Sequence, residues 1–189
     1  MTEAAVTPSS EQDFSLYAMW SAGDSRSGDQ LLRRLSPLMQ QFYATKVRPE
    51  DVEDLIQQVW VELSAARRRR TEIRATVRSY VLGIARHVLC RYLRKKYDGD
   101  VVDIDPLRSS IANLDPSLST VIGERMAAQR MMLALQRLPI DTQILLELRY
   151  VSGLTTVELA AMYEIPVGTI KSRLSHARVA LEKEVDGRW

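Results

Sequence analysis

Cysteine, histidine, glycine and proline are all scarce in this chain of 189 residues. The single cysteine, Cys90, excludes an intrachain disulfide and favours a reducing, cytoplasmic setting. One cysteine and two histidines are also too few for an ordinary structural zinc site. The sequence contains neither a run of about 18 apolar residues nor an N-terminal apolar segment, so we expect no membrane insertion and no secretory signal. Hydrophobic residues make up 46% of the chain, which is enough for a folded core.

Charge is distributed very unevenly, although the net charge is only +2. Residues 67–96 contain 11 basic residues and one acidic residue, a net charge of +10. The flanking segments are acidic: residues 1–66 have 5 basic and 10 acidic residues, and residues 97–124 have 1 basic and 6 acidic residues. A basic block of this density in a nearly neutral protein indicates a polyanionic partner such as nucleic acid.

Apolar residues follow helical spacing along most of the chain, and no stretch shows the alternation typical of a strand. The pattern is interrupted by a segment that is rich in aspartate and contains two prolines. We therefore predict an all-α fold of two small helical domains joined by a flexible acidic linker. The expected parts are a disordered tail at 1–13, an N-terminal domain at 14–97, the linker at 98–121 and a C-terminal domain at 122–189.

The clearest local signal lies near the end of the chain. Thr155 and Glu158 have the spacing of a capping box, which predicts a short helix, and Pro166 is suited to open a longer helix after a tight turn. The longer helix has one apolar face and an opposite face rich in basic and hydroxyl side chains. This pattern is typical of a helix-turn-helix, whose second helix enters the major groove and contacts phosphates and base edges. The candidate DNA-binding residues are Thr169, Lys171, Ser172, Arg173, His176 and Arg178.

A set of short motifs extends this interpretation to the whole chain. In the C-terminal part they are Leu138-Pro139, Leu148-Arg149-Tyr150, Gly153-Leu154, Glu158-Leu159-Ala160 and the run from Ile165 to Leu174. In the N-terminal part they are Ala22-Gly23-Asp24, the run from Pro49 to Trp60, Ile84-Ala85-Arg86 and Leu93-Arg94-Lys95-Lys96. Together they resemble the bacterial sigma factors of the sigma-70 family, and most closely its extracytoplasmic function (ECF) subfamily.

The resemblance implies a subunit without catalytic activity or cofactor that binds core RNA polymerase and directs it to promoter DNA. It assigns the −35 duplex to the helix-turn-helix, and the −10 element with strand opening to the basic N-terminal domain. An anti-sigma factor is a further partner that the resemblance allows. The implied polymerase-binding residues are Asp51, Asp54, Gln57, Gln58 and Trp60, and the implied −10 residues are Arg67, Arg68, Arg69, Arg70, Arg74, Arg78, Arg86, Arg91, Arg94 and Lys95.

Several positions depart from the family pattern. His87 and Arg91 stand where the −10 helix of the family often has asparagine and aspartate, and His176 stands where its recognition helix often has arginine. Four consecutive arginines, 67–70, take the place of a loop that often carries an aromatic residue and a glycine. These differences leave the −10 sequence preference open. The acidic linker is either a mimic of nucleic-acid charge inside the polymerase or an ordinary flexible connector.

Other classes of function remain as alternatives. A free-standing helix-turn-helix regulator would bind duplex DNA without polymerase, but this leaves the N-terminal motifs unexplained. A sigma mimic that sequesters a regulator should have lost its DNA-facing charges, whereas Lys171 and Arg173 are present. An enzyme is not expected, because the sequence has no glycine-rich phosphate loop and no recognisable nucleophile motif.

Overall fold

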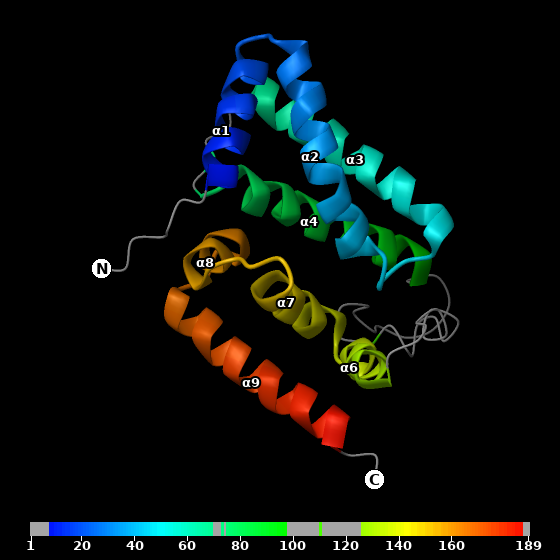
Figure 1. The fold of residues 1–189 in the computed structure, drawn as a ribbon. Helices are drawn as coiled ribbons and strands as arrows, with labels where there is room; N and C mark the ends of the chain where they lie inside the picture. The colour runs from blue at the N-terminus through cyan, green and yellow to red at the C-terminus, as the bar shows by residue number, and fades with distance from the viewer. Residues whose placement is uncertain (1–7, 70–72, 74, 98–109, 111–125, 187–189) are drawn as a thin grey trace.

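The computed structural model describes residues 8–69, 73, 75–97, 110 and 126–186. Within these ranges the regular structure consists of eight helices, and the only β-type pairing is an isolated bridge between Ser110 and Pro139. Figure 1 shows two groups of helices, α1–α4 and α6–α9, stacked against each other. We call these the N-terminal and C-terminal helical groups. None of the described helices is long and apolar enough to cross a membrane.

The first two helices form an antiparallel pair at the top of the N-terminal helical group (Figure 1). Helix α1 spans Pro8–Ser21, and α2 spans Ser25–Tyr43. The expectation of a disordered tail over 1–13 is wrong for residues 8–13, which are helical. Asp13 explains why: its carboxylate is almost fully buried and accepts a 2.7 Å hydrogen bond from Arg34 Nε of α2, a contact between distant parts of the sequence. Residues 1–7 lie outside the described part.

Helices α3 and α4 carry most of the basic block. Helix α3 spans Pro49–Arg68 and starts as expected, with a proline in its first turn and two acidic residues that favour the positive end of the helix dipole. Helix α4 spans Val77–Tyr97 and has three basic residues in its last turn, where they favour the negative end. The two helices pack along each other through buried apolar residues that include Val59, Leu63 and Leu89.

The C-terminal helical group contains the predicted helix-turn-helix. Its helices are α6 (Met126–Arg137), α7 (Ile140–Tyr150), α8 (Thr156–Tyr163) and α9 (Val167–Asp186). The capping box is confirmed, because the Thr155 side chain accepts from the Glu158 backbone N–H and the Glu158 side chain accepts from the Thr155 N–H. Helix α8 ends at Glu164 in the left-handed conformation, with φ of 54°, which reverses the chain into α9.

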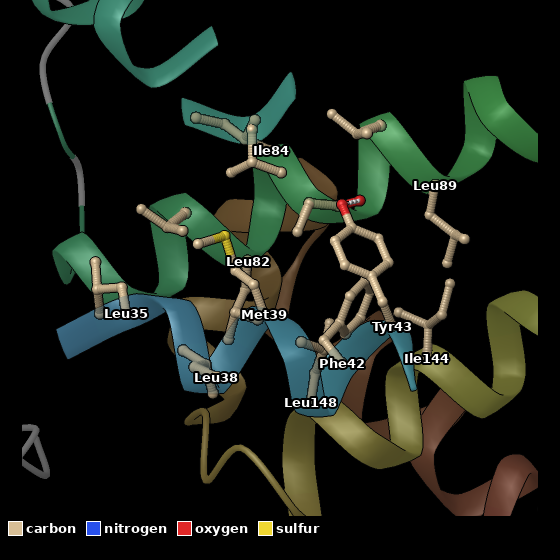
Figure 2. Packing of buried hydrophobic residues seen from close by; sticks show 14 of the residues in the cluster. Leu35, Leu38, Met39, Phe42, Tyr43, Leu82, Ile84, Leu89, Ile144 and Leu148 are labelled. Carbon is tan, nitrogen blue, oxygen red and sulfur yellow. Dashed lines mark hydrogen bonds between the residues drawn. The ribbon is translucent and has the colours of Figure 1, made fainter. Parts of the chain in front are cut away.

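One apolar cluster extends through both helical groups. Ile144 and Leu148 of α7 are fully buried and belong to the same cluster as Phe42, Tyr43 and Leu89 of the N-terminal helical group. Figure 2 shows Ile144 and Leu148 beside these residues. The predicted linker, 98–121, falls outside the described residues except for Ser110, which is buried in its bridge to Pro139.

Replacing a fully buried residue of α4 should destabilise the fold. Leu82 has no exposed surface, so Leu82→Ala removes buried methyl groups and leaves a cavity. We expect the free energy of unfolding to fall by about 2–5 kcal/mol, measured by chemical denaturation. The matched control Val179→Ala, at a side chain 48% exposed on α9, should change it by no more than about 0.5 kcal/mol. Equal effects of the two substitutions would contradict the packing described above.

Candidate nucleic-acid interface

Helix α9 presents the predicted −35 residues on its solvent-exposed side. Ile170, Leu174 and Ala177 are buried against the rest of the C-terminal helical group, which fixes the rotation of the helix. All six side chains predicted to bind DNA are exposed: Thr169, Lys171, Ser172, Arg173, His176 and Arg178. The short α8 packs beside α9 in the arrangement of a helix-turn-helix (Figure 1).

The exposed residues of α9 divide into two edges. Arg173 and His176 line a cavity of about 370 Å³ between α7 and α9, together with Asp141 and Thr142. At about 100° per residue, Lys171 and Arg178 fall on the other side of the exposed face. The helix therefore presents cations along both margins of a face whose centre carries hydroxyl groups.

The four arginines at the end of α3 do not share one environment. Arg67 is partly buried: its Nη1 donates a 2.7 Å hydrogen bond to the Trp20 carbonyl, and its guanidinium stacks 4.4 Å from the Trp20 ring. Arg68 and Arg69 are exposed. Arg70 lies outside the described residues, as does Arg74. The structure therefore gives Arg67 a packing contact with α1, and leaves Arg68 and Arg69 accessible to a ligand.

The basic residues of α4 likewise differ in their contacts. Arg78, Arg94 and Lys95 are exposed. Arg91 forms an ion pair with Glu62 of α3. Arg86 contacts the C-terminal helical group: its Nη2 lies 2.7 Å from Asp141 Oδ1, and its guanidinium lies 4.4 Å from the centre of the Tyr163 ring.

His87 lies beside Arg86 on the side of α4 that faces α8. It lines a cavity of about 450 Å³ between these helices, with Tyr80, Gly83, Glu158 and Met162 among the other lining residues. Burial lowers the pKa of His87, and the neighbouring Arg86 charge lowers it further. The imidazole is therefore neutral at neutral pH and contributes no positive charge to the basic block.

The predicted polymerase-binding residues of α3 also fall into two sets. Asp54, Gln57 and Gln58 are exposed and line a shallow depression of about 340 Å³ with Val61, Glu62 and Arg91. Asp51 is instead bound by α4, because its carboxylate accepts hydrogen bonds from Tyr92 Oη at 2.5 Å and Lys96 Nζ at 3.1 Å.

These contacts stabilise the charged form of Asp51. The Tyr92 hydrogen bond is the main cause that lowers the pKa of Asp51, and the Lys96 ammonium adds to it. Trp60, the fifth predicted polymerase-binding residue, packs against the core, and its Nε1 finds no hydrogen-bond partner among the described residues. The face of α3 that is open to a partner is thus the one formed by Asp54, Gln57 and Gln58.

Sequence reasoning missed a set of polar contacts between the two helical groups. Lys46, in the turn that follows α2, is buried and forms an ion pair with Glu147 of α7. Thr76 Oγ1, just before α4, donates a 2.6 Å hydrogen bond to Glu158 Oε1 of α8. A single lysine in an apolar stretch carries no local signal of such a contact. Within the described residues, no cluster of three or more histidine, cysteine or acidic side chains is placed to hold a metal ion.

Two family models match the chain. The model for sigma-70 region 2 matches residues 30–98, and the model for sigma-70 region 4 matches residues 128–181. The first covers most of α2, α3 and α4, and the second covers the helix-turn-helix and the two helices before it. Between them the two models span more than half of the chain.

Two of the similar proteins match this chain over most of their length, and a third matches over a shorter stretch. The chain is 26% identical over 152 residues to the RNA polymerase sigma factor HrpL of Pseudomonas syringae pv. syringae, covering 79% of this chain and 82% of that protein. It is 24% identical over 173 residues to the ECF RNA polymerase sigma-E factor of Escherichia coli K12, covering 86% and 88%. With the sigma-E factor of Salmonella typhimurium LT2 it shares 39% identity over 51 residues, 27% of each chain.

Solved structures share the fold. The structure of CnrH in complex with the cytosolic domain of CnrY matches 94% of this chain and 99% of that chain, with a TM-score of 0.66 and 20% identity. The sigma factor RpoE in complex with the anti-sigma factor NepR from Bartonella quintana matches 87% and 99%, with a TM-score of 0.61 and 21% identity. With both sigma-70 regions present in the family's order and ECF factors among its relatives, the chain belongs to the ECF subfamily of the sigma-70 family of RNA polymerase sigma factors.

Proposed function

We propose that this sigma factor binds core RNA polymerase and positions it at promoters by reading two DNA elements. In this proposal α9 reads the −35 duplex, the basic side of α3 and α4 captures the −10 strand, and the polar face of α3 binds polymerase. The observation that carries the proposal is the exposed face of α9: all six predicted DNA-contacting side chains are solvent-exposed on a helix that its own core holds in place.

The −35 assignment follows from the geometry of the helix-turn-helix. A recognition helix enters the major groove with its N-terminal half, and that half of α9 bears Thr169, Ser172 and Arg173. An arginine at such a position can form two hydrogen bonds with a guanine edge. Lys171 and Arg178, along the opposite margin, suit contacts with the phosphate backbone.

The −10 assignment rests on the accessible cations of the N-terminal helical group. Arg68, Arg69, Arg78, Arg94 and Lys95 are exposed and free to neutralise phosphates. Tyr80 and Tyr92 are packed against the core, so their rings are not free stacking platforms in this arrangement. Capture of the melted strand is therefore proposed to depend on backbone contacts, and Arg67 to act by fixing the end of α3 against Trp20.

The partner assignments complete the proposal. Asp54, Gln57 and Gln58 form an exposed polar face on a rigid helix, which suits a protein surface rich in hydrogen-bonding groups. RpoE of Bartonella quintana is bound to an anti-sigma factor in its solved structure, and we extend to this chain the capacity to bind such a regulator. Two domains, at 14–97 and 122–189, and a cytoplasmic location are parts of the same proposal.

A reconstituted transcription assay tests the proposal. The purified chain and core polymerase are mixed, captured through a tag on the polymerase, and used for run-off transcription from genomic fragments. Stoichiometric capture with new start sites supports the proposal. Specific duplex binding by the chain alone, without polymerase capture, would favour a free-standing regulator.

Arg173→Ala should weaken −35 recognition and leave polymerase capture unchanged. Loss of a bidentate contact costs about 1–3 kcal/mol, roughly a 5- to 150-fold loss of affinity for the −35 duplex. The measurement is holoenzyme binding to promoter DNA together with capture by core polymerase. Lys183→Ala, at an exposed position in the last turn of α9, is the matched control and should retain affinity. Equal loss of DNA binding and polymerase capture in Arg173→Ala would contradict the assignment.

Asp54→Ala combined with Gln57→Ala should lower capture by core polymerase, because both side chains belong to the exposed polar face of α3. We expect a loss of about tenfold or more in competition binding, as for truncation of central interface residues. Asp29→Ala with Gln30→Ala removes the same two residue types from exposed positions on α2 and should have no effect. Normal capture by the α3 variant would place the polymerase site elsewhere.

A further inference from the structure

The two helical groups are joined by an ion pair that is buried. Lys46 is 1% exposed, and its ammonium donates to the Phe42 carbonyl at 2.6 Å, to Thr45 Oγ1 at 3.2 Å and to the Glu147 carboxylate. Phe42 also stacks under the charge, with its ring centre 4.4 Å from Nζ. Both of these supporting residues come from the N-terminal helical group. The carboxylate that balances the charge comes from α7, on the other side of the contact.

Glu147 is also positioned by a residue of its own helix, α7. Its Oε1 accepts a 2.9 Å hydrogen bond from Gln143 Nε2, one turn earlier in α7, and Gln143 has no exposed surface. Thr45 Oγ1, from the Lys46 side of the contact, donates to the same oxygen at 3.3 Å. Each charged group thus has a hydrogen-bond partner on its own side, Phe42 for Lys46 and Gln143 for Glu147, which helps to offset the cost of leaving water.

Two further contacts join the two helical groups. Arg86, which the family resemblance assigns to the −10 element, is engaged by Asp141 and by the Tyr163 ring. Thr76, just before α4, donates a hydrogen bond to Glu158, the same residue that completes the capping box of α8. Figure 1 shows α8 lying against α4, so the first helix of the helix-turn-helix covers part of the proposed −10 surface.

The chemistry of the ion pair explains its place in the contact. Burial lowers the pKa of Lys46, and the Glu147 carboxylate acts against that shift. A buried pair adds little net stability compared with apolar residues, but removal of one partner is strongly unfavourable because a charge remains unpaired in the interior. Packing of the two helical groups therefore requires the pair to form. The apolar surfaces of α2, α4 and α7 can stay together only in the arrangement that brings Lys46 to Glu147.

We propose that the Lys46–Glu147 pair is an interdomain latch that holds this sigma factor in a closed state, in which the C-terminal helical group covers Arg86 and the adjoining part of the −10 surface. In the closed state Arg86 is bound to Asp141, and in the open state it is free for a DNA phosphate. Both ions of the latch become hydrated on opening, so separation leaves no unpaired buried charge. The regulatory role of the latch rests on the proposed function, because it concerns access to the −10 surface.

The test uses the full chain with Glu147→Gln, which removes the charge of the latch with little change in shape. Donor and acceptor dyes on Gln40→Cys of α2 and Val179→Cys of α9, both exposed, report the distance between the groups by energy transfer, with buried Cys90 replaced by alanine. Binding of a short fluorescent single-stranded oligonucleotide of mixed sequence reports access to the −10 surface. We expect lower energy transfer in this variant. We also expect its affinity for the oligonucleotide to rise about tenfold, which is the change for loss of a closed state that holds about nine-tenths of the molecules.

The matched control is Asp13→Asn. Asp13 is a carboxylate as buried as Glu147, but its ion pair with Arg34 lies entirely within the N-terminal helical group. This variant should keep the energy transfer and the oligonucleotide affinity of the parent. If Glu147→Gln also keeps both values, or if Asp13→Asn changes them equally, the latch is rejected.

A second variant, Lys46→Met, covers the case in which Glu147→Gln does not fold. It removes the other charge of the latch and leaves the Glu147 carboxylate unpaired in the interior. Lower energy transfer in this variant supports the latch, and unchanged transfer overturns it. If energy transfer falls but neither parent nor variant binds the oligonucleotide, the contact is upheld and the proposed function is what fails.

Discussion

Burial of the inner face of α7 is the constraint on which the arrangement of this protein depends. Ile144 and Leu148 have no exposed surface, and they are covered by residues of α2 and α4 rather than by the C-terminal helical group alone. The same face carries Glu147, so burying it places a carboxylate in the interior. Lys46 forms an ion pair with that carboxylate. The apolar and ionic contacts together fix the relative position of the two helical groups.

The basic residues of this protein fall into two populations. The first population forms contacts within the protein. Arg67 donates a hydrogen bond to the Trp20 carbonyl, Arg91 forms an ion pair with Glu62, and Arg86 forms an ion pair with Asp141. Those left exposed lie at the end of α3, at both ends of α4 and along α9. A high local density of positive charge is therefore only partly available to DNA in the closed arrangement, and Arg86 is the residue whose partner must change.

Local signals in the sequence were sufficient for the helices and for the helix-turn-helix. The proline and acidic residues that open α3, the capping box of α8 and the apolar stripe of α9 act within a few residues of one another, so their geometry follows from the sequence. Contacts between residues that are distant in the sequence could not be predicted in this way. The helical state of residues 8–13 depends on Arg34, and the packing role of Arg67 depends on Trp20, each far away in the sequence. The pairing of Lys46 with Glu147 joins residues 101 positions apart.

The most direct test of this account is to lock the two helical groups together and measure transcription. Because a Cβ on Gly83 would lie 3.4 Å from Met162 Cγ, cysteines at both positions are within reach of a disulfide across α4 and α8. Run-off transcription with core polymerase is then compared for the oxidised and reduced forms of Gly83→Cys/Met162→Cys. We expect promoter-directed transcripts from the reduced form and their loss in the oxidised form, with recovery on adding reductant. Equal transcription by the two forms would contradict it, because the closed arrangement would then be able to open promoters.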